Sequence, residues 1–380
     1  MFTIENENKS PYTFLGLFSG AGGLDLGFEK AGFHHICSMD ILHCAVNTLK
    51  CNRPDWQVLE GDVREYTPSV QNIDVLLAGF PCQGFSLGGN RDVNDSRNTL
   101  YKEVIRITKS IKPRIVVMEN VLNLRTMIHP ITKKPFCNQI ADEMDAIGYK
   151  TVFQSFKVSQ YGVPQTRRRF IFIACRDDLL KYYKFPEPEK DTSIRSFLYD
   201  LGQNLTIDLP NHNPCWGFSS TVHKETNEPY SADEIAIPVR FSRTASEGTP
   251  IRNFDQPFPA VDTATLWGWA IGNVQANRIE KDRTEKDAMF VRNKNSTAKL
   301  WRIQASQLRQ FTHREYARLQ TFPDDWIFCG DNHREIHLQI GNAVPVEFAK
   351  RIAISVRAAL EKHDKNIPPC ENDRQLSLFD

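Results

Sequence analysis

The sequence lacks the features that mark membrane-spanning and secreted proteins. No stretch comes close to about 20 uninterrupted apolar residues, the length that a membrane-spanning helix requires. The N-terminal residues MFTIENENKSPYTF contain no charged segment followed by an apolar one, the pattern of a secretion signal. With 41% hydrophobic and 24% charged residues in 380, the composition is that of a globular protein. We therefore expect a cytoplasmic protein with room for two domains.

Cysteine pairing and a charge excess are also missing. The nine cysteines are an odd number and form no C-x-x-C pair, which argues against a disulfide framework and against a zinc site. The net charge of +1 lacks the basic excess of many nucleic-acid-binding proteins. Locally, however, residues 176–239 contain 6 Lys and Arg against 11 Asp and Glu, whereas residues 240–312 contain 12 against 7. The later segment is the candidate for phosphate contacts.

The first 175 residues alternate β-rich runs with amphipathic segments. The runs are YTFLGLF, HHICSM, WQVLE, IDVLLAGF, RIVVMEN, TVFQSFKV and RFIFIAC. Apolar residues at helical spacing predict helices over 24–31, 45–52, 99–111 and 138–147. This order predicts an α/β fold with a doubly wound, mainly parallel sheet.

The regular alternation stops after residue 175. Residues 176–312 contain only short β-like runs among Pro, Asn, Asp and Trp, which predicts a smaller, irregular, β-rich second domain. Two helical segments follow within 313–363, and the apolar stripe of the second suits packing against the sheet, so the chain should return to its first domain. We expect the tail, 364–380, to be loosely ordered.

A glycine-rich turn follows the first predicted strand. FLGLFSGAGGLDLGFEKAG places a strand before glycines 20, 22 and 23 and a helix after them, which suits close approach of the backbone to a nucleotide-like ligand. Asp25 occupies the third glycine position of G-x-G-x-x-G, which disfavours a nicotinamide oxidoreductase. Asp40 and Asp62 follow the next two strands and could bind the same ligand, but each could equally cap a helix or a turn.

Cys82 follows Pro81 in a constrained loop after the strand IDVLLAGF. Most cysteines are inert packing groups, so a nucleophilic role requires partners. Glu119 ends the next apolar strand, where burial would raise its pKa and suit it to donate a proton. Arginines 167, 168 and 169 directly precede the apolar run FIFIAC, and at least one of them should point inward.

Six blocks occur in the order found in the cytosine-5 DNA methyltransferase family, which this sequence resembles. They are FSGAGGLDLGFEKAGF, GFPCQGFS, ENV, QYGVPQTRRRF, RLQTFPDDW and QIGNAVP. The resemblance covers nearly all of the chain except about 176–312. It implies the S-adenosylmethionine-dependent methyltransferase fold, with a catalytic and cofactor-binding domain over 1–175, a target-recognition domain over 176–312 and a return into the catalytic domain over 313–363.

The resemblance also implies roles for individual residues. Asp40 would hold the ribose of S-adenosylmethionine, where the family more usually has glutamate, and Asp62 would hold the adenine amino group. Asn342 would close the pocket. The other residues expected to line it are Phe18, Gly20, Gly22 and Pro81.

The reaction implied by the resemblance begins when Cys82 attacks carbon 6 of a cytosine, which makes carbon 5 a nucleophile for the methyl group. Glu119 would neutralise ring nitrogen 3, and Arg169, less directly Arg167, would anchor the carbonyl oxygen of the base. The second product would be S-adenosylhomocysteine, and no metal is needed. The cytosine must first rotate out of the DNA double helix.

Contacts with double-stranded DNA are expected from two regions. The glycine-containing segment from Ser86 to Arg97 resembles the mobile loop of the family, although it could be an ordinary surface connection. In the recognition region the candidates are Arg240, Arg243, Arg252, Arg278 and Arg283, each of which could instead be solvated or salt-bridged. No base-reading residue is assigned.

Two other functions remain open: an RNA cytosine-5 methyltransferase, and a catalytically inactive DNA-binding homologue. The length of the 176–312 region favours DNA over RNA, and the presence of Cys82, Glu119 and Arg169 favours activity. By analogy we expect a monomeric enzyme of the bacterial restriction-modification type, which could function alongside a cognate restriction endonuclease.

Overall fold

The computed structural model describes most of the chain. The described residues are 12–81, 99–129, 131–176, 178–214, 254–263, 266–270 and 308–367, with the backbone of four further short strands. Cys82, Ser86, Arg97, Arg243, Arg252 and Arg283 lie outside them. The chain forms two compact units: residues 1–156, 168–188 and 346–380 make the first, and residues 157–167 and 189–345 make the second.

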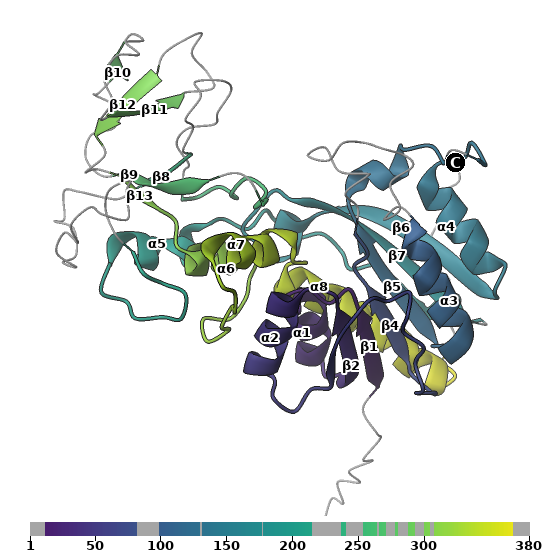
Figure 1. The fold of residues 1–380 in the computed structure, drawn as a ribbon. Helices are drawn as coiled ribbons and strands as arrows, with labels where there is room; N and C mark the ends of the chain where they lie inside the picture. The colour runs from purple at the N-terminus through teal and green to yellow at the C-terminus, as the bar shows by residue number, and fades with distance from the viewer. Residues whose placement is uncertain are drawn as a thin grey trace, which may run out of the picture. The chain divides into compact units, whose positions relative to one another are not determined.

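A seven-stranded sheet forms the centre of the first unit (Figure 1). Its strands are β1 (Thr13–Leu17), β2 (His34–Asp40), β3 (Val58–Glu60), β4 (Val75–Ala78), β5 (Ile115–Asn120), β6 (Tyr149–Lys157) and β7 (Arg168–Arg176). They lie in the order β3-β2-β1-β4-β5-β7-β6, and the pairs β2–β3, β1–β2, β1–β4 and β4–β5 are parallel. Strand β7 runs antiparallel to β5. The predicted doubly wound, mainly parallel sheet is confirmed.

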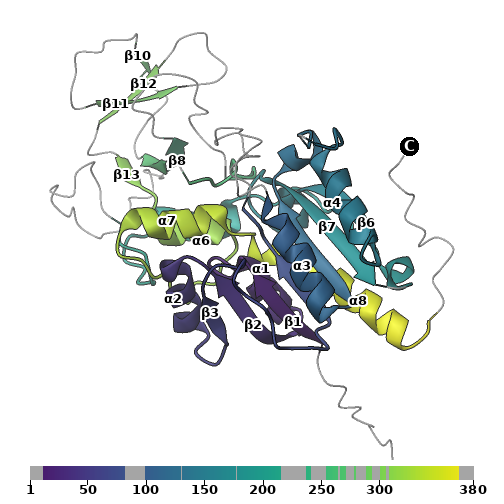
Figure 2. The ribbon, with the colours of Figure 1, turned by 45° about the vertical axis from the view of Figure 1, so that its right-hand side comes forward.

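Helices cover both faces of this sheet. They are α1 (Gly23–Lys30), α2 (His43–Asn52), α3 (Tyr101–Ile111), α4 (Phe136–Asp145) and α8 (Val346–Asp364), with the short 3-10 helices η2 (Leu122–Arg125) and η4 (Leu179–Tyr182). Leu15 and Leu17 belong to one apolar cluster with buried residues of α3 and α4, which lie side by side in Figure 2. On the opposite face, the ring of Phe14 lies 6.1 Å from that of Phe28 in α1. Alternate side chains of β1 therefore pack against helices on opposite faces of the sheet.

Close packing joins α1 to α8, although they lie at opposite ends of the chain. A Cβ atom added to Gly27 would lie 2.4 Å from Cβ of Ala349, so only glycine permits this approach. Arg357 donates a hydrogen bond to the carbonyl of Ala31 at the end of α1, over 2.9 Å. The predicted C-terminal helix thus completes the first unit.

The second unit combines small antiparallel sheets with helices. One sheet has the order β10-β12-β11 and the other β13-β9-β8. The strands are β8 (Ile237–Arg240), β9 (Trp267–Ala270), β10 (Arg278–Ile279), β11 (Ala288–Arg292), β12 (Leu300–Gln304) and β13 (Leu308–Gln310), and the helices are η3 (Val158–Tyr161), α5 (Arg195–Gln203), α6 (His313–Leu319) and α7 (His333–Asn342). This agrees with the predicted small β-rich fold.

A buried ion pair links strand β13 to the start of helix α6 in this unit. Arg309 and Glu315 are fully buried, and their charged atoms lie 2.7 Å apart. Nε1 of Trp269 donates to Glu315 over 2.8 Å, and Thr312 caps α6 together with the same glutamate. Within the part of the chain that the structure describes, no helix has both the length and the apolar character needed to cross a membrane.

Candidate active site

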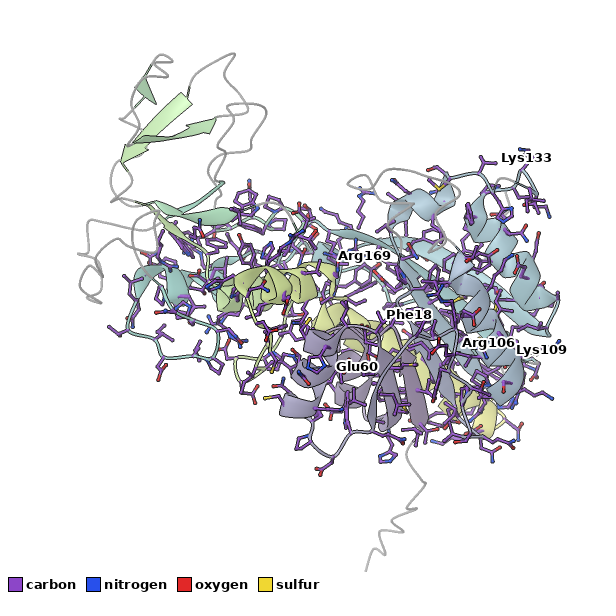
Figure 3. The ribbon with its side chains drawn as sticks, in the orientation of Figure 1. Phe18, Glu60, Arg106, Lys109, Lys133 and Arg169 are labelled. Carbon is purple, nitrogen blue, oxygen red and sulfur yellow. The ribbon has the colours of Figure 1, made fainter. Side chains whose placement is uncertain are left out.

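The carboxyl ends of β1, β4 and β5 lie at one edge of the sheet because the three strands are parallel. An antiparallel neighbour begins where its partner ends, so the start of β7 lies at the same edge. The register pairs Asn120 with Phe170 and Glu119 with Ile171. This places Arg169, which precedes Phe170, beside the acidic end of β5. Figure 3 labels Arg169 at the start of β7 and Phe18 directly after β1.

Glu119 and Arg169 form an ion pair in which Arg169 Nε lies 2.6 Å from Glu119 Oε1. Only 10% of the glutamate side chain and 14% of the arginine side chain are exposed. Burial raises the pKa of Glu119, and the charge and hydrogen bond of Arg169 oppose that rise. Burial and Arg169 therefore act on this carboxyl group in opposite directions, and burial has the larger effect.

Gly79, directly after β4, lies between the end of β1 and this acid. A Cβ atom on Gly79 would lie 3.7 Å from the carbonyl oxygen of Phe18 and 3.9 Å from Glu119 Oε2. The backbone nitrogen of Gly79 donates to the carbonyl of Leu17 over 3.4 Å. The predicted cofactor turn, the predicted acid and the chain leading to Cys82 therefore meet at one residue.

Asn120 is a site residue that the sequence analysis did not identify. Its side chain, 2% exposed, donates from Nδ2 to the carbonyl of Phe80 over 3.2 Å and accepts from the backbone of Val121 over 2.8 Å. It thereby holds the backbone next to Pro81, two residues before Cys82. A signal was available, because a buried amide that ends an apolar strand needs hydrogen-bond partners.

The turn after β1 has an unusual backbone. Phe18, Gly20 and Gly22 have φ angles of 56°, 54° and 83°, in the left-handed region. Glycine adopts this region without steric cost, whereas Phe18 requires support from its surroundings. A Cβ atom on Gly20 would meet nothing within 4 Å, so this part of the turn borders open space.

Asp40, at the end of β2, anchors that turn. Its Oδ2 accepts a hydrogen bond from the backbone of Gly20 over 2.7 Å, and its Oδ1 accepts one from the backbone of Leu42 over 2.9 Å. Burial raises the pKa of Asp40, although hydrogen bonds from the backbones of Leu42, Gly20 and Ile41 favour the charged form. The side chain of Ile41, directly after it, is 62% exposed.

Asp62, two residues after β3, pairs with Arg64. Nε of Arg64 lies 3.0 Å from each carboxylate oxygen, Nη2 makes a further contact, and the backbone of Arg64 donates to Oδ1 over 2.9 Å. The side-chain hydrogen bond of Arg64 is the main reason why the pKa of Asp62 falls to about 2. Arg106 of α3, labelled in Figure 3, donates to the carbonyls of Val63 and Tyr66 just after Asp62.

Arg167 and Asn342 belong to the second unit. Arg167, 3% exposed, donates through Nη1 to the carbonyls of Val261 and Gly341 over 2.7 Å each. Its Nη2 reaches the carbonyl of Asn342, the last residue of α7, over 3.4 Å. These contacts link three segments of the second unit through main-chain atoms. The predicted contact of Arg167 with the base remains a prediction.

Comparison with known proteins identifies the family. Residues 12–358 match the family model of C-5 cytosine-specific DNA methylases. The chain belongs to this family. The type II methyltransferase M.Eco47II of Escherichia coli is 33% identical over 364 residues, which cover 94% of this methylase and 82% of that protein. M.NgoMIV of Neisseria gonorrhoeae is 31% identical over 93% of the chain and 99% of its own length.

Solved structures show the same fold. A DNA modification methyltransferase encoded within an Escherichia coli prophage superposes with a TM-score of 0.57 at 24% identity, over 92% of this methylase and 99% of that chain. A mutant of DNMT2 from Spodoptera frugiperda gives 0.55 at 17% identity, over 92% and 99%. At these identities the likeness is one of fold.

Of the arginines predicted to contact DNA in this methylase, two lie in strands that the structure describes. Arg240 is the last residue of β8 and Arg278 the first of β10. Their backbones belong to the two small sheets of the second unit. Among the described residues, no group of three or more His, Cys, Asp or Glu side chains could hold a metal ion.

Proposed function

We propose that this DNA (cytosine-5)-methyltransferase transfers a methyl group from S-adenosylmethionine to a cytosine in a specific duplex sequence, with Cys82 as the nucleophile. The observation that carries the proposal is the position of Gly79, which lies close both to the main chain of Phe18 and to Glu119, the partner of Arg169. Cys82 follows Gly79 by three residues. A nucleophile, an acid and a cation would thus lie beside the cofactor turn.

The residues at this edge fit S-adenosylmethionine. The left-handed turn borders open space at Gly20, as close approach of a ligand requires. Asp40 and Asp62 place carboxylates after β2 and β3, where they can accept hydrogen bonds from ribose hydroxyls and an adenine amino group. Ile41 offers exposed apolar surface beside them. When bound, S-adenosylmethionine supplies an electrophilic methyl group on a sulfonium centre.

Three side chains would act on the cytosine. The Cys82 thiolate forms a bond to carbon 6, and the electron pair of the 5,6 double bond becomes available at carbon 5 to take the methyl group. Glu119 gives a proton or a strong hydrogen bond to ring nitrogen 3 as charge develops there, a role that its raised pKa supports. Arg169, with several donors in one plane, can contact both Glu119 and the carbonyl oxygen of the base. The carbon 5 proton then leaves to solvent, the electron pair of that bond re-forms the 5,6 double bond and the thiolate is expelled, while any proton given to ring nitrogen 3 returns to Glu119.

Asn120 and Arg167 would act as positioning residues. Asn120 holds the carbonyl of Phe80 and so directs the chain toward Cys82. Arg167 ties Val261, in the region predicted to recognise DNA, to Gly341 at the end of α7. We assign the proposed base contact to Arg169 because its guanidinium is the one that meets Glu119.

The second unit is the proposed recognition module. A cytosine stacked in a duplex must be extruded at a cost of a few kcal/mol, which contacts from Ser86–Arg97 and the recognition region would offset. Because relatives carry the name type II methyltransferase, we infer a role in restriction-modification, beside a cognate endonuclease. Since the groups named for the chemistry come from one chain, we propose a monomer.

The test uses labelled S-adenosylmethionine with duplex DNA of mixed sequence and, separately, RNA of matched sequence. A Cys82→Ser variant with unchanged S-adenosylmethionine binding is the control. Label at carbon 5 of cytosines in one short DNA motif, located by bisulfite sequencing and abolished by the substitution, is expected. Transfer to RNA alone would contradict the DNA assignment, and cofactor binding without transfer to either would indicate an inactive homologue.

A further inference from the structure

A buried acid that the proposed reaction does not use lies beneath the glycine turn. Asp25, in the first turn of α1, is 1% exposed. Burial raises its pKa to about 6, and the hydrogen bonds of two serine hydroxyls limit that rise. Neither of these donors carries a charge. A carboxyl group buried in this way costs stability unless its contacts serve the fold or the site.

The hydrogen bonds of Asp25 form a directed chain. Ser38 Oγ donates to Asp25 Oδ1 over 2.6 Å, and Ser19 Oγ donates to the same oxygen over 3.0 Å. His35 Nε2 lies 2.8 Å from Ser38 Oγ. Because Ser38 gives its single hydroxyl proton to Asp25, His35 must act as the donor to Ser38. The His35 ring stacks on Trp56 with centroids 3.9 Å apart and an interplanar angle of 7°, which fixes its orientation.

Gly16 provides the space for this carboxylate. A Cβ atom on Gly16 would lie 2.1 Å from Asp25 Oδ1 and 2.7 Å from Ser19 Oγ. In dinucleotide-binding folds a third glycine in the helix permits close packing on the strand. In this protein the glycine is in the strand, and an acid from the helix fills the space. Asp25, which stands at the third glycine position of G-x-G-x-x-G, therefore fills a space that Gly16 leaves open.

Two acids, one from α1 and one from β2, bind neighbouring residues of the turn. Asp25 binds the side chain of Ser19, and Asp40 binds the backbone of Gly20. The backbone of Ser19 also donates to the carbonyl of Met39 over 3.0 Å. Ser19 thus joins the turn both to α1 and to β2, directly after Phe18, whose left-handed conformation needs support.

We propose that Asp25 is a positioning residue for the S-adenosylmethionine-binding turn, and that it acts through Ser19. This inference rests on the proposed function, because the turn has to bind that ligand. Asp25 would not touch the ligand itself. Its effect would be to keep Phe18 and Gly20 in the conformation that leaves the turn open for the ligand.

Ser19→Ala and Ser38→Ala make a matched pair of variants, because each removes one hydroxyl from the same carboxylate oxygen. Only Ser19 belongs to the turn. We expect Ser19→Ala to weaken S-adenosylmethionine binding about tenfold by titration calorimetry, the loss typical of one hydrogen bond to a charged group. Ser38→Ala should lower the melting temperature but leave the affinity near that of the wild type.

Asp25→Asn adds a rescue test, since the amide oxygen can still accept both hydroxyl protons. Asp25→Ala should raise the KM for S-adenosylmethionine more than that for DNA, and Asp25→Asn should restore it. Equal affinities for S-adenosylmethionine in the two serine variants, or equal KM values for it in the two Asp25 variants, would contradict the proposal. Asp25 would then contribute only to stability. Wild-type protein that binds no S-adenosylmethionine would instead overturn the proposed function, and this inference with it.

Discussion

Arg169 Nε lies 2.6 Å from Glu119 Oε1, across the junction at which the parallel strands meet the antiparallel strand β7. The reversal of β7 brings an arginine that begins one strand to a glutamate that nearly ends another. In a wholly parallel sheet the start of β7 would lie at the opposite edge. The pairing of acid and cation is thus a consequence of topology, and it motivates the first prediction.

Glu119→Gln should lower kcat by about 10²- to 10⁴-fold, the usual contribution of a general acid, with little change in the KM for S-adenosylmethionine. Glutamine keeps the shape of the side chain but cannot donate a carboxyl proton. Single-turnover methyl transfer to a defined duplex would measure the effect. If kcat stayed near the wild-type value, Glu119 would have no part in proton transfer.

Asn120→Ala should lower both activity and stability. The substitution leaves the carbonyl of Phe80 and the backbone of Val121 without their buried partner, at a cost of about 1–3 kcal/mol. Thermal melting measures the stability, and kcat at a temperature well below the melting range separates the two effects. Asn120→Asp is a second variant: it keeps an acceptor for Val121, replaces the amide donor to Phe80 with a carboxyl oxygen and adds a buried acid next to Glu119, so it should lose at least as much activity. Full activity in both variants would exclude a positioning role.

Arg64→Ala should strengthen S-adenosylmethionine binding by a few-fold. Arg64 is largely exposed and holds the Asp62 carboxylate, which the proposed function assigns to the adenine amino group. Arg64 and the adenine amino group would compete for the Asp62 carboxylate. Because exposed ion pairs are weak, removal of Arg64 should increase the affinity only slightly. Asp62→Asn should act in the opposite direction. Weaker binding after Arg64→Ala would mean that Arg64 aligns Asp62 instead of competing for it.

Asp25→Asn should change how stability depends on pH. The pKa of Asp25 in the folded protein, about 6, exceeds its ordinary value of 3.8, so the folded state holds more protons between these values. The free energy of unfolding of the wild type should therefore fall as the pH rises through that window, by up to about 3 kcal/mol relative to Asp25→Asn. Urea unfolding of both proteins from about pH 3.5 to 7 measures the difference. Parallel stability curves would show that Asp25 titrates normally.

Strands β4, β5 and β7 could be predicted because each contains a continuous apolar run of four or more residues. Helix α7 (His333–Asn342) was not predicted, and its composition explains why. Ile336, Leu338 and Ile340 alternate with polar residues, a spacing of two that is typical of a strand. The signal that was overlooked is its start, where Asn332 caps the helix and accepts a hydrogen bond from the backbone of Glu335.

The partners of the site residues were less predictable than their positions. Cysteine, acid and arginine could be selected by residue type and by their place at strand ends. That Arg169 meets Glu119 whereas Arg167 binds carbonyls within the second unit depends on contacts between segments far apart in the sequence. The same holds for Asp25, whose environment is made by Gly16, Ser19 and Ser38 from two strands and a turn.

The packing of α8 against α1 also affects how the protein folds during synthesis. Gly27 lies in the first helix, but its partner Ala349 is translated only after residues 189–345 of the other unit. At ordinary rates of about 5–20 residues per second, the ribosome needs on the order of 10 s or more to reach it. During that interval the apolar side of α1 has no α8 to cover it. A nascent chain of this enzyme therefore cannot complete the packing of its first unit until α8 emerges from the exit tunnel.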